Sequence, residues 1–90
     1  MKLTKGFQLR KVGGESVVVP EGVEVIDFNK LICLNSSAAY LWNELGKLPS
    51  FEIEDVVRLL VQNYEVETST AQRDAEELLH EWIKNGIVVA

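Results

Sequence analysis

The sequence predicts an α+β fold in which a three-stranded antiparallel sheet precedes three helices. In the first third of the chain, short apolar runs are separated by glycine turns, as is typical of strands. From residue 36 onward, apolar residues recur with helical spacing. Between these parts, residues 31–42 run from an apolar strand directly into a capped helix. Because 90 residues suit one modest core, we expect a single domain over residues 1–90.

A β-hairpin begins the fold. Residues 7–12 roughly alternate apolar and polar side chains, and residues 16–19 form the returning strand. Gly13 and Gly14 supply the two positive-φ positions of the tight turn between them. The sequence Pro-Glu-Gly at residues 20–22 ends the second strand, because proline cannot donate to the ladder.

The third strand is predicted at residues 31–34, after a segment, residues 23–30, that mixes strand and loop character. Alternation places apolar side chains of this short run on both of its faces. We therefore expect the strand to be central in the sheet or covered on its second side. The apolar tail, residues 87–90, packs back on the domain as a short extra strand and is a candidate for that cover.

The first helix spans about residues 36–45, begins at a cap formed by Asn35 or Ser36, and ends at Gly46 in a left-handed conformation. The second helix begins at Pro49-Ser50 and carries acidic residues in its first turn. The third begins at Thr68 or Ser69 and ends at Asn85-Gly86. The predicted buried stripes of the three helices are Ala38, Leu41, Trp42 and Leu45; Ile53, Val56, Val57, Leu60, Val61 and Tyr64; and Ala71, Ala75, Leu78, Leu79, Trp82 and Ile83.

The composition argues against several classes of function. Cys33 is the only cysteine and His80 the only histidine, so the sequence predicts no disulfide, metal site or cofactor. We expect Cys33 to be a small buried hydrophobe rather than a reactive thiol, and His80 to lie at the surface. No nucleophile with a neighbouring base, phosphate-binding loop or paired carboxylates is recognisable, so we predict that the chain is not an enzyme. It has no apolar run long enough to cross a membrane and no secretory signal, which predicts a cytoplasmic protein.

Charge is unevenly distributed. Residues 1–36 carry five basic and four acidic side chains, whereas residues 37–90 carry four basic and ten acidic ones. The helical part is therefore acidic.

Four short motifs resemble those of the PqqD-like family, the coenzyme PQQ synthesis protein D type, whose members are small domains with a winged helix-turn-helix-like fold. The resemblance runs from Phe7 to Ile87. The motifs are Val19-Pro20-Glu21-Gly22; Leu34-Asn35-Ser36-Ser37-Ala38-Ala39 followed by Leu41-Trp42; Glu54-Asp55-Val56-Val57 with Leu60 and Tyr64; and Asp74 followed by Leu78 and Leu79.

The resemblance implies recognition of the leader of a ribosomally made precursor peptide, which such proteins present to a modifying enzyme, often of the radical SAM type. In that family the leader adds as a strand to the third strand and lies against the third helix. The matching peptide-binding residues here are Leu31, Ile32, Cys33 and Leu34 on the strand and Ala71, Asp74, Ala75, Glu77, Leu78 and Glu81 on the helix.

The residues themselves are compatible with this interpretation and with a purely structural one. Ala71 and Ala75 keep one side of the third helix thin, which would leave a groove with Leu78 as its floor, but any helix packed on a sheet uses such positions. Asp74, Glu77 and Glu81 would rim that groove and favour a basic or mixed-charge leader, or would simply form a solvated face. Trp42 and Trp82 are expected in the core.

Two rival functions belong to other classes. A winged-helix DNA-binding regulator has the same order of elements, but its recognition helix would here carry Arg73 and Lys84 against Asp74, Glu76, Glu77 and Glu81, the wrong balance for phosphate contacts. A general protein-interaction module would use the same strand edge, and the sequence does not separate it from leader recognition. It leaves the oligomeric state open as well.

Overall fold

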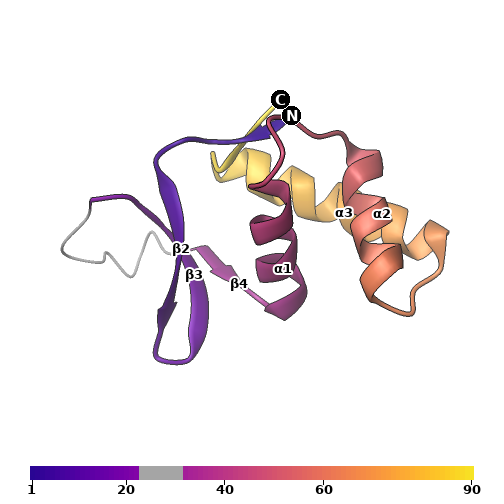
Figure 1. Cartoon of the computed structure of the whole chain (residues 1–90), viewed down its shortest axis with the longest axis horizontal. Helices are drawn as coiled ribbons and strands as arrows, with labels where there is room; N and C mark the ends of the chain where they lie inside the picture. The colour runs from indigo at the N-terminus through magenta and orange to yellow at the C-terminus, as the bar shows by residue number, and fades with distance from the viewer. Residues whose placement is uncertain (23–31) are drawn as a thin grey trace.

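A computed structural model describes residues 1–22 and 32–90 of the chain. Within them the element order is β1 (Lys2–Leu3), β2 (Phe7–Val12), β3 (Glu15–Pro20), β4 (Ile32–Leu34), α1 (Ser36–Leu45), α2 (Ile53–Asn63), α3 (Thr68–Lys84) and β5 (Val88–Val89). The predicted class is confirmed, because a three-stranded antiparallel sheet precedes three helices (Figure 1). The predictions for residues 23–30 and for Leu31 fall outside the described residues.

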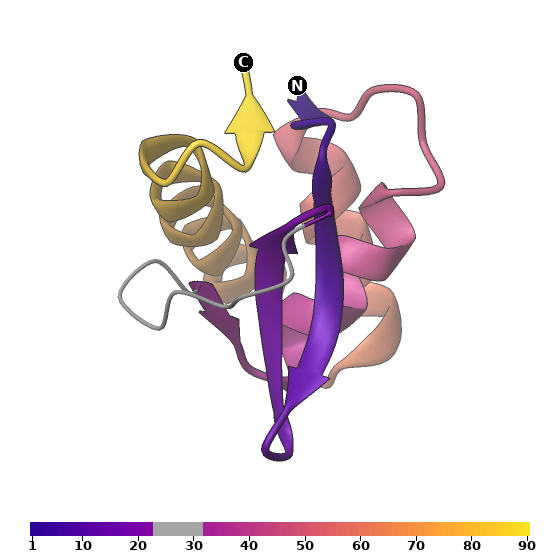
Figure 2. The same cartoon turned by 90° about the vertical axis from the view of Figure 1, so that its left-hand side faces the viewer.

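The main sheet has the order β2-β3-β4, and both neighbouring pairs are antiparallel. Gly13 and Gly14 join β2 to β3 with φ values of 59° and 84°, which are the two positive angles of a type I′ turn. The hairpin is therefore the predicted one, and β3 is one residue longer at each end than predicted. Figure 2 shows the hairpin crossing in front of the helices, with β4 beside it on the same side of the molecule as α3.

The tail forms a strand, as predicted, but its partner is at the other end of the chain. β5 pairs antiparallel with β1, so that Lys2 lies opposite Val89 and Leu3 opposite Val88. The two chain ends consequently lie together, away from β4 (Figure 1). The alternative in which the tail covers the third strand is therefore wrong, because the tail's hydrogen-bonding partner is β1.

Helix α1 begins at the predicted cap. Asn35 is the cap residue, and its side-chain oxygen accepts hydrogen bonds from the Ala38 amide at 2.8 Å and from the Ser37 hydroxyl at 2.9 Å. The prediction of a left-handed Gly46 is wrong, since this residue has φ −64° and its amide still donates to the Trp42 carbonyl at 3.0 Å. Gly86 after α3 does have the positive φ, 80°.

Helix α2 begins at Ile53, three residues after the predicted start. The Asp55 carboxylate accepts a hydrogen bond from the Glu52 amide at 2.8 Å, which caps the helix at Glu52. Phe51 is buried ahead of the helix, and its amide donates to the Met1 carbonyl at 2.7 Å. Glu52 itself is extended, with φ −116° and ψ 170°, so the helix begins only at the next residue.

The core lies between the helices and one face of the sheet. Trp42 and Trp82 are both buried, as predicted, and meet edge to face with ring centroids 5.8 Å apart. Three residues near the ends of α2 and α3 were predicted to be buried but are about two-fifths exposed. They are Val61, Tyr64 and Ile83. Tyr64 follows the last residue of α2 in extended backbone, so helical periodicity does not apply to it. On α2, Leu59 is buried instead.

The cap of α1 gives a first test, by substitution of Asn35. Asn35→Ala removes the acceptor of the Ala38 amide and should lower the free energy of unfolding by about 0.5–2 kcal/mol. Ser36→Ala is the matched control, because Ser36 is the exposed first residue of the helix and its loss should change stability by less than about 0.5 kcal/mol. Urea denaturation measures both, and equal losses would contradict the assignment of the cap to Asn35.

Candidate functional site

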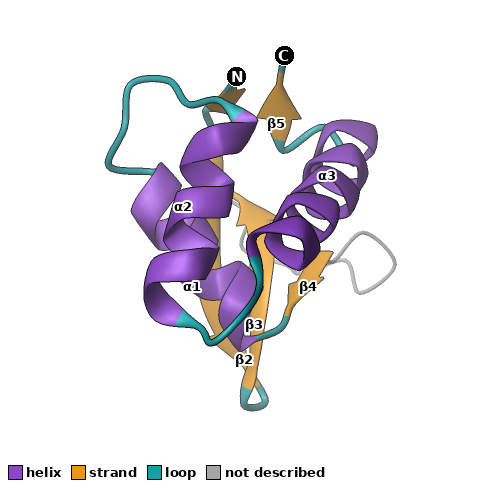
Figure 3. Ribbon diagram, turned by 90° about the vertical axis from the view of Figure 1, so that its right-hand side faces the viewer, coloured by secondary structure: helices purple, strands orange, loops and turns teal. Residues whose placement is uncertain are grey.

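Strand β4 is at one edge of the main sheet and has a single strand neighbour within residues 1–22 and 32–90. Its pairs with β3 are Ser16 opposite Leu34, Val17 opposite Cys33 and Val18 opposite Ile32. Its other side faces away from the sheet, on the side of the molecule where α3 lies (Figure 3). An edge of this kind presents main-chain groups that another strand can pair with.

The hairpin turn determines which main-chain groups of β3 face β4. In a two-residue type I′ hairpin the residues flanking the turn, here Val12 and Glu15, form a hydrogen-bonded pair. Because successive residues of a strand direct their amide and carbonyl groups to opposite sides, those of Ser16 and Val18 point from β3 toward β4.

The same alternation identifies the open groups of β4. Leu34 and Ile32 lie opposite Ser16 and Val18, so their amide and carbonyl groups face β3. Cys33 lies between them, and its amide and carbonyl therefore face outward from the sheet edge. Among the residues that the structure describes on β4, Cys33 is the one that can form both main-chain bonds with an added strand.

The side chain of Cys33 is exposed, so the expectation of a buried thiol is wrong. Its neighbours are covered, because Leu34 belongs to the core and Ile32 packs against it. The prediction relied on the apolar residues on either side of Cys33. Alternate residues of a strand face opposite sides of the sheet, so buried neighbours do not imply that Cys33 is buried. The thiol thus lies on the sheet face opposite the helices.

A cavity of about 380 Å³ opens between the three helices, next to the carboxyl end of β4. Its lining comes from the start of α1, from α2 and from one face of α3. The lining residues are Asn35, Ser37, Ala38, Leu41, Leu60, Asp74, Glu77, Leu78 and Glu81. Asn35 directly follows β4, so the cavity begins where the strand edge ends.

Four of the predicted peptide-binding residues meet in this cavity. Asp74, Glu77 and Glu81 occupy positions i, i+3 and i+7 of α3, with Leu78 between them, and therefore share one helix face. The three carboxyl side chains are exposed, whereas Leu78 is half-buried against the core. The lining contains no lysine, arginine or histidine. The α3 side of the cavity is therefore acidic, and apolar side chains from all three helices also line it.

Ala71 and Ala75 have no exposed surface and belong to the core. They are not among the residues that line the cavity, and a role for them in peptide binding stays a prediction. The small side chains let α3 approach the elements packed on it, chiefly α2. Ile32, Cys33 and Leu34 also lie outside the cavity lining, on the adjoining strand.

Five lining residues were not predicted: Asn35, Ser37, Ala38, Leu41 and Leu60. Asn35 was recognisable only as a helix cap, and its capping bond is indeed made. The apolar residues lie on the helix stripes that the periodicity assigns to the core. Periodicity indicates that a residue faces inward, but it does not distinguish a filled interior from the floor of a cavity.

Metal-binding clusters and membrane-spanning helices are absent from the described part of the chain. No group of three or more His, Cys, Asp and Glu side chains there could hold a metal ion. His80 is exposed, as predicted. No described helix is both long enough and apolar enough to cross a membrane.

Comparison with known proteins places this arrangement in a family. The family model for coenzyme PQQ synthesis protein D (PqqD) matches residues 15–88. The chain belongs to the PqqD family. A similar solved structure is TbiB1 in complex with the TbiA(beta) leader peptide, with a TM-score of 0.71 and 17% sequence identity over 97% of this chain and 93% of that chain. This likeness shows a shared fold. No curated protein sequence matches the chain.

The burial of Ala75 leads to a second prediction. Ala75→Leu inserts three carbon atoms where no surface is exposed, so it should lower the free energy of unfolding by about 1–3 kcal/mol. Arg73→Leu places the same side chain at an exposed position of the same helix and should cost less than about 0.5 kcal/mol. Chemical denaturation distinguishes them. An Ala75→Leu protein as stable as the wild type would show that this side of α3 has room.

Proposed function

We propose that this PqqD-family chain binds the leader of a ribosomally made precursor peptide and presents it to a modifying enzyme, for which a radical SAM enzyme is the candidate. The chain itself acts as a binding protein, and the partner enzyme supplies the chemistry. Membership of the PqqD family supports this proposal, and the similar fold of TbiB1 was solved with a leader peptide. The single observation that carries it is the edge of β4, which has no strand neighbour other than β3 among the described residues and lies beside the cavity on α3.

The proposed binding mode is addition of a strand to β4. The amide of the guest residue opposite Cys33 donates a hydrogen bond to the Cys33 carbonyl. The carbonyl of the same guest residue accepts one from the Cys33 amide. Such bonds give affinity for peptides of many sequences, because every residue except proline carries both groups. Guest side chains then provide selectivity according to the face on which they lie.

The two faces of a guest strand meet different surroundings. The side chain of the guest residue opposite Cys33 lies on the same face as the thiol, away from the helices. The next residue along, opposite Leu34, directs its side chain to the helix side, where α3 and the cavity lie. A leader bound in this way would have alternate residues in contact with the protein.

Cys33 allows a direct test of this mode, because it is the only cysteine in the chain and its thiol is exposed. The probe is the leader of the precursor encoded beside this gene, made as a set of peptides with one cysteine moved along the sequence. Hydrogen-bonded partners in an antiparallel ladder have Cα atoms about 5.5 Å apart. That separation is within the range of about 4.4–6.8 Å that a disulfide requires.

We expect disulfide formation to peak at the leader position opposite Cys33. It should recur more weakly two residues away, where a shift of the guest strand by two residues brings that position opposite Cys33, and the intervening positions should be unreactive. Mass spectrometry of the oxidised mixtures measures the yield at each position. Cys33→Ser is the control and should abolish cross-linking while leaving binding intact. A yield that repeats every three to four positions would indicate a bound helix and would overturn strand addition. Absence of any leader binding would overturn the function.

A further inference from the structure

We infer that the cavity on α3 selects a lysine or arginine side chain of the bound peptide, one that points to the helix side close to the carboxyl end of β4. This inference rests on the proposed function and adds the chemical class of the peptide residue that the site takes. It makes the peptide's basic residue, rather than its general hydrophobicity, the feature that distinguishes a cognate leader.

The first argument is the chemical match of the cavity to a long basic side chain. Apolar surface from Ala38, Leu41, Leu60 and Leu78 forms the floor, and the charged lining groups are all carboxylates. Lysine and arginine combine an apolar stem with a cationic end, so each part meets a matching surface. The volume of about 380 Å³ lies within the range, about 300–1,000 Å³, that is typical of small-ligand sites.

The second argument is the charge pattern of α3. Asp74 with Glu77, and Glu77 with Glu81, are like-charge pairs at i, i+3 and i, i+4 spacing, which destabilise a helix. The ion pairs found between side chains of the described residues lie elsewhere, at Lys47 with Glu44 and at Arg58 with Asp55, and none of them involves the three cavity carboxylates. A cation placed among these carboxylates would relieve their mutual repulsion, whereas an acidic guest side chain would increase it.

The third argument is the position of the cavity relative to the strand edge. Asn35 both follows β4 and lines the cavity. A guest strand paired with Cys33 therefore passes the cavity mouth within the next few residues, and only residues at odd separations from the one opposite Cys33 point to the helix side. The basic residue must then stand one or three positions from the residue that cross-links to Cys33.

The test uses a random-peptide display library of about 20 residues per member, selected on the full chain. We expect selected peptides to share a lysine or arginine at one fixed position. Individual peptides are then synthesised with a cysteine scan to locate the residue opposite Cys33, and with the basic residue replaced by glutamine. Affinities are measured by isothermal titration calorimetry at low and high salt, because contacts between partly exposed charges weaken with ionic strength.

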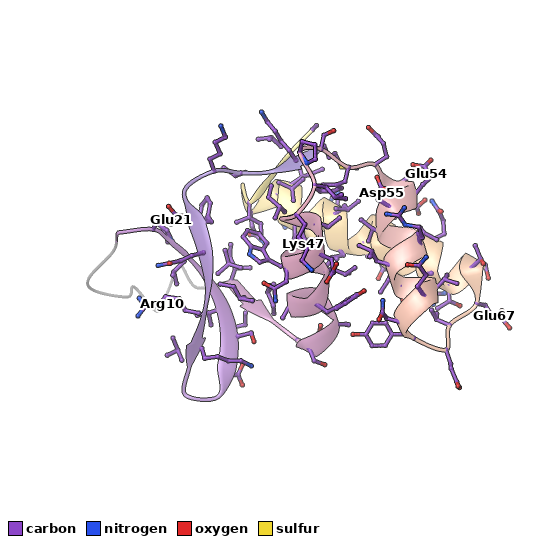
Figure 4. The ribbon with its side chains drawn as sticks, in the orientation of Figure 1. Arg10, Glu21, Lys47, Glu54, Asp55 and Glu67 are labelled. Carbon is purple, nitrogen blue, oxygen red and sulfur yellow. The ribbon has the colours of Figure 1, made fainter. Side chains whose placement is uncertain are left out.

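The key variant combines Asp74→Asn, Glu77→Gln and Glu81→Gln, which removes the three charges at nearly constant size. It should weaken the lysine-containing peptide about tenfold and leave the glutamine peptide unchanged. The matched control combines Glu21→Gln, Glu54→Gln and Glu65→Gln, exposed residues outside the cavity lining. It changes the net charge equally and should leave both affinities within about twofold. Figure 4 shows Glu21, which directly follows β3, and Glu54 on α2.

Three outcomes separate the inference from the function on which it rests. A shared basic residue at an odd separation, with loss of preference only in the cavity variant, supports both. Selected peptides that cross-link to Cys33 in alternation but show no basic preference, or bind the cavity variant equally well, overturn the inference and leave strand addition standing. If the library yields no peptide that binds above background, the proposed function fails and the inference fails with it.

Discussion

Pairing of β5 with β1 is the constraint that fixes the apolar tail at the chain ends, away from the edge of β4. Two residue pairs form the ladder, and the Thr4 amide and hydroxyl extend it with bonds of 2.9 Å and 2.7 Å to the carbonyls of Ile87 and Gly86. Ile87 and Val88 are buried at this join. The apolar tail therefore pairs and packs at the far end of the molecule. Within residues 1–22 and 32–90, β4 has no strand partner besides β3. Exposed edges invite unwanted pairing, and a short edge strand such as β4 limits that risk.

Strong local periodicity explains which parts of the fold were predictable. The hairpin follows from alternation around Gly13-Gly14, and the helices follow from apolar stripes with recognisable caps such as Asn35. The partner of the tail was not predictable, because the two residues of β1 are too few to show any pattern. The pairing also joins segments more than 80 residues apart, and no local signal records such a contact.

The site was predictable to the extent that it lies on one face of a helix. Spacing alone brings Asp74, Glu77 and Glu81 together on α3. A small residue is ambiguous, since Ala75 could have left space or allowed close packing, and the structure shows the second. Cys33 is a similar case, because an apolar neighbourhood in the sequence does not reveal which sheet face the helices cover. These ambiguities are tertiary, and only the packed arrangement resolves them.

In the proposed function, affinity and selectivity arise from different parts of the molecule. Main-chain bonds at Cys33 would hold almost any extended segment, so they cannot by themselves distinguish a leader from other peptides. A discriminating element must therefore contact side chains, and the cavity beside the strand end is placed to do so. Its carboxylates repel acidic peptides. They also repel the phosphates of nucleic acids, which would otherwise compete for the exposed surface of α3. Repulsion of the wrong ligands contributes to specificity as much as attraction of the right one does. It gives a physical reason for negative charge beside β4, because the main-chain bonds of that strand do not depend on the sequence of the bound peptide.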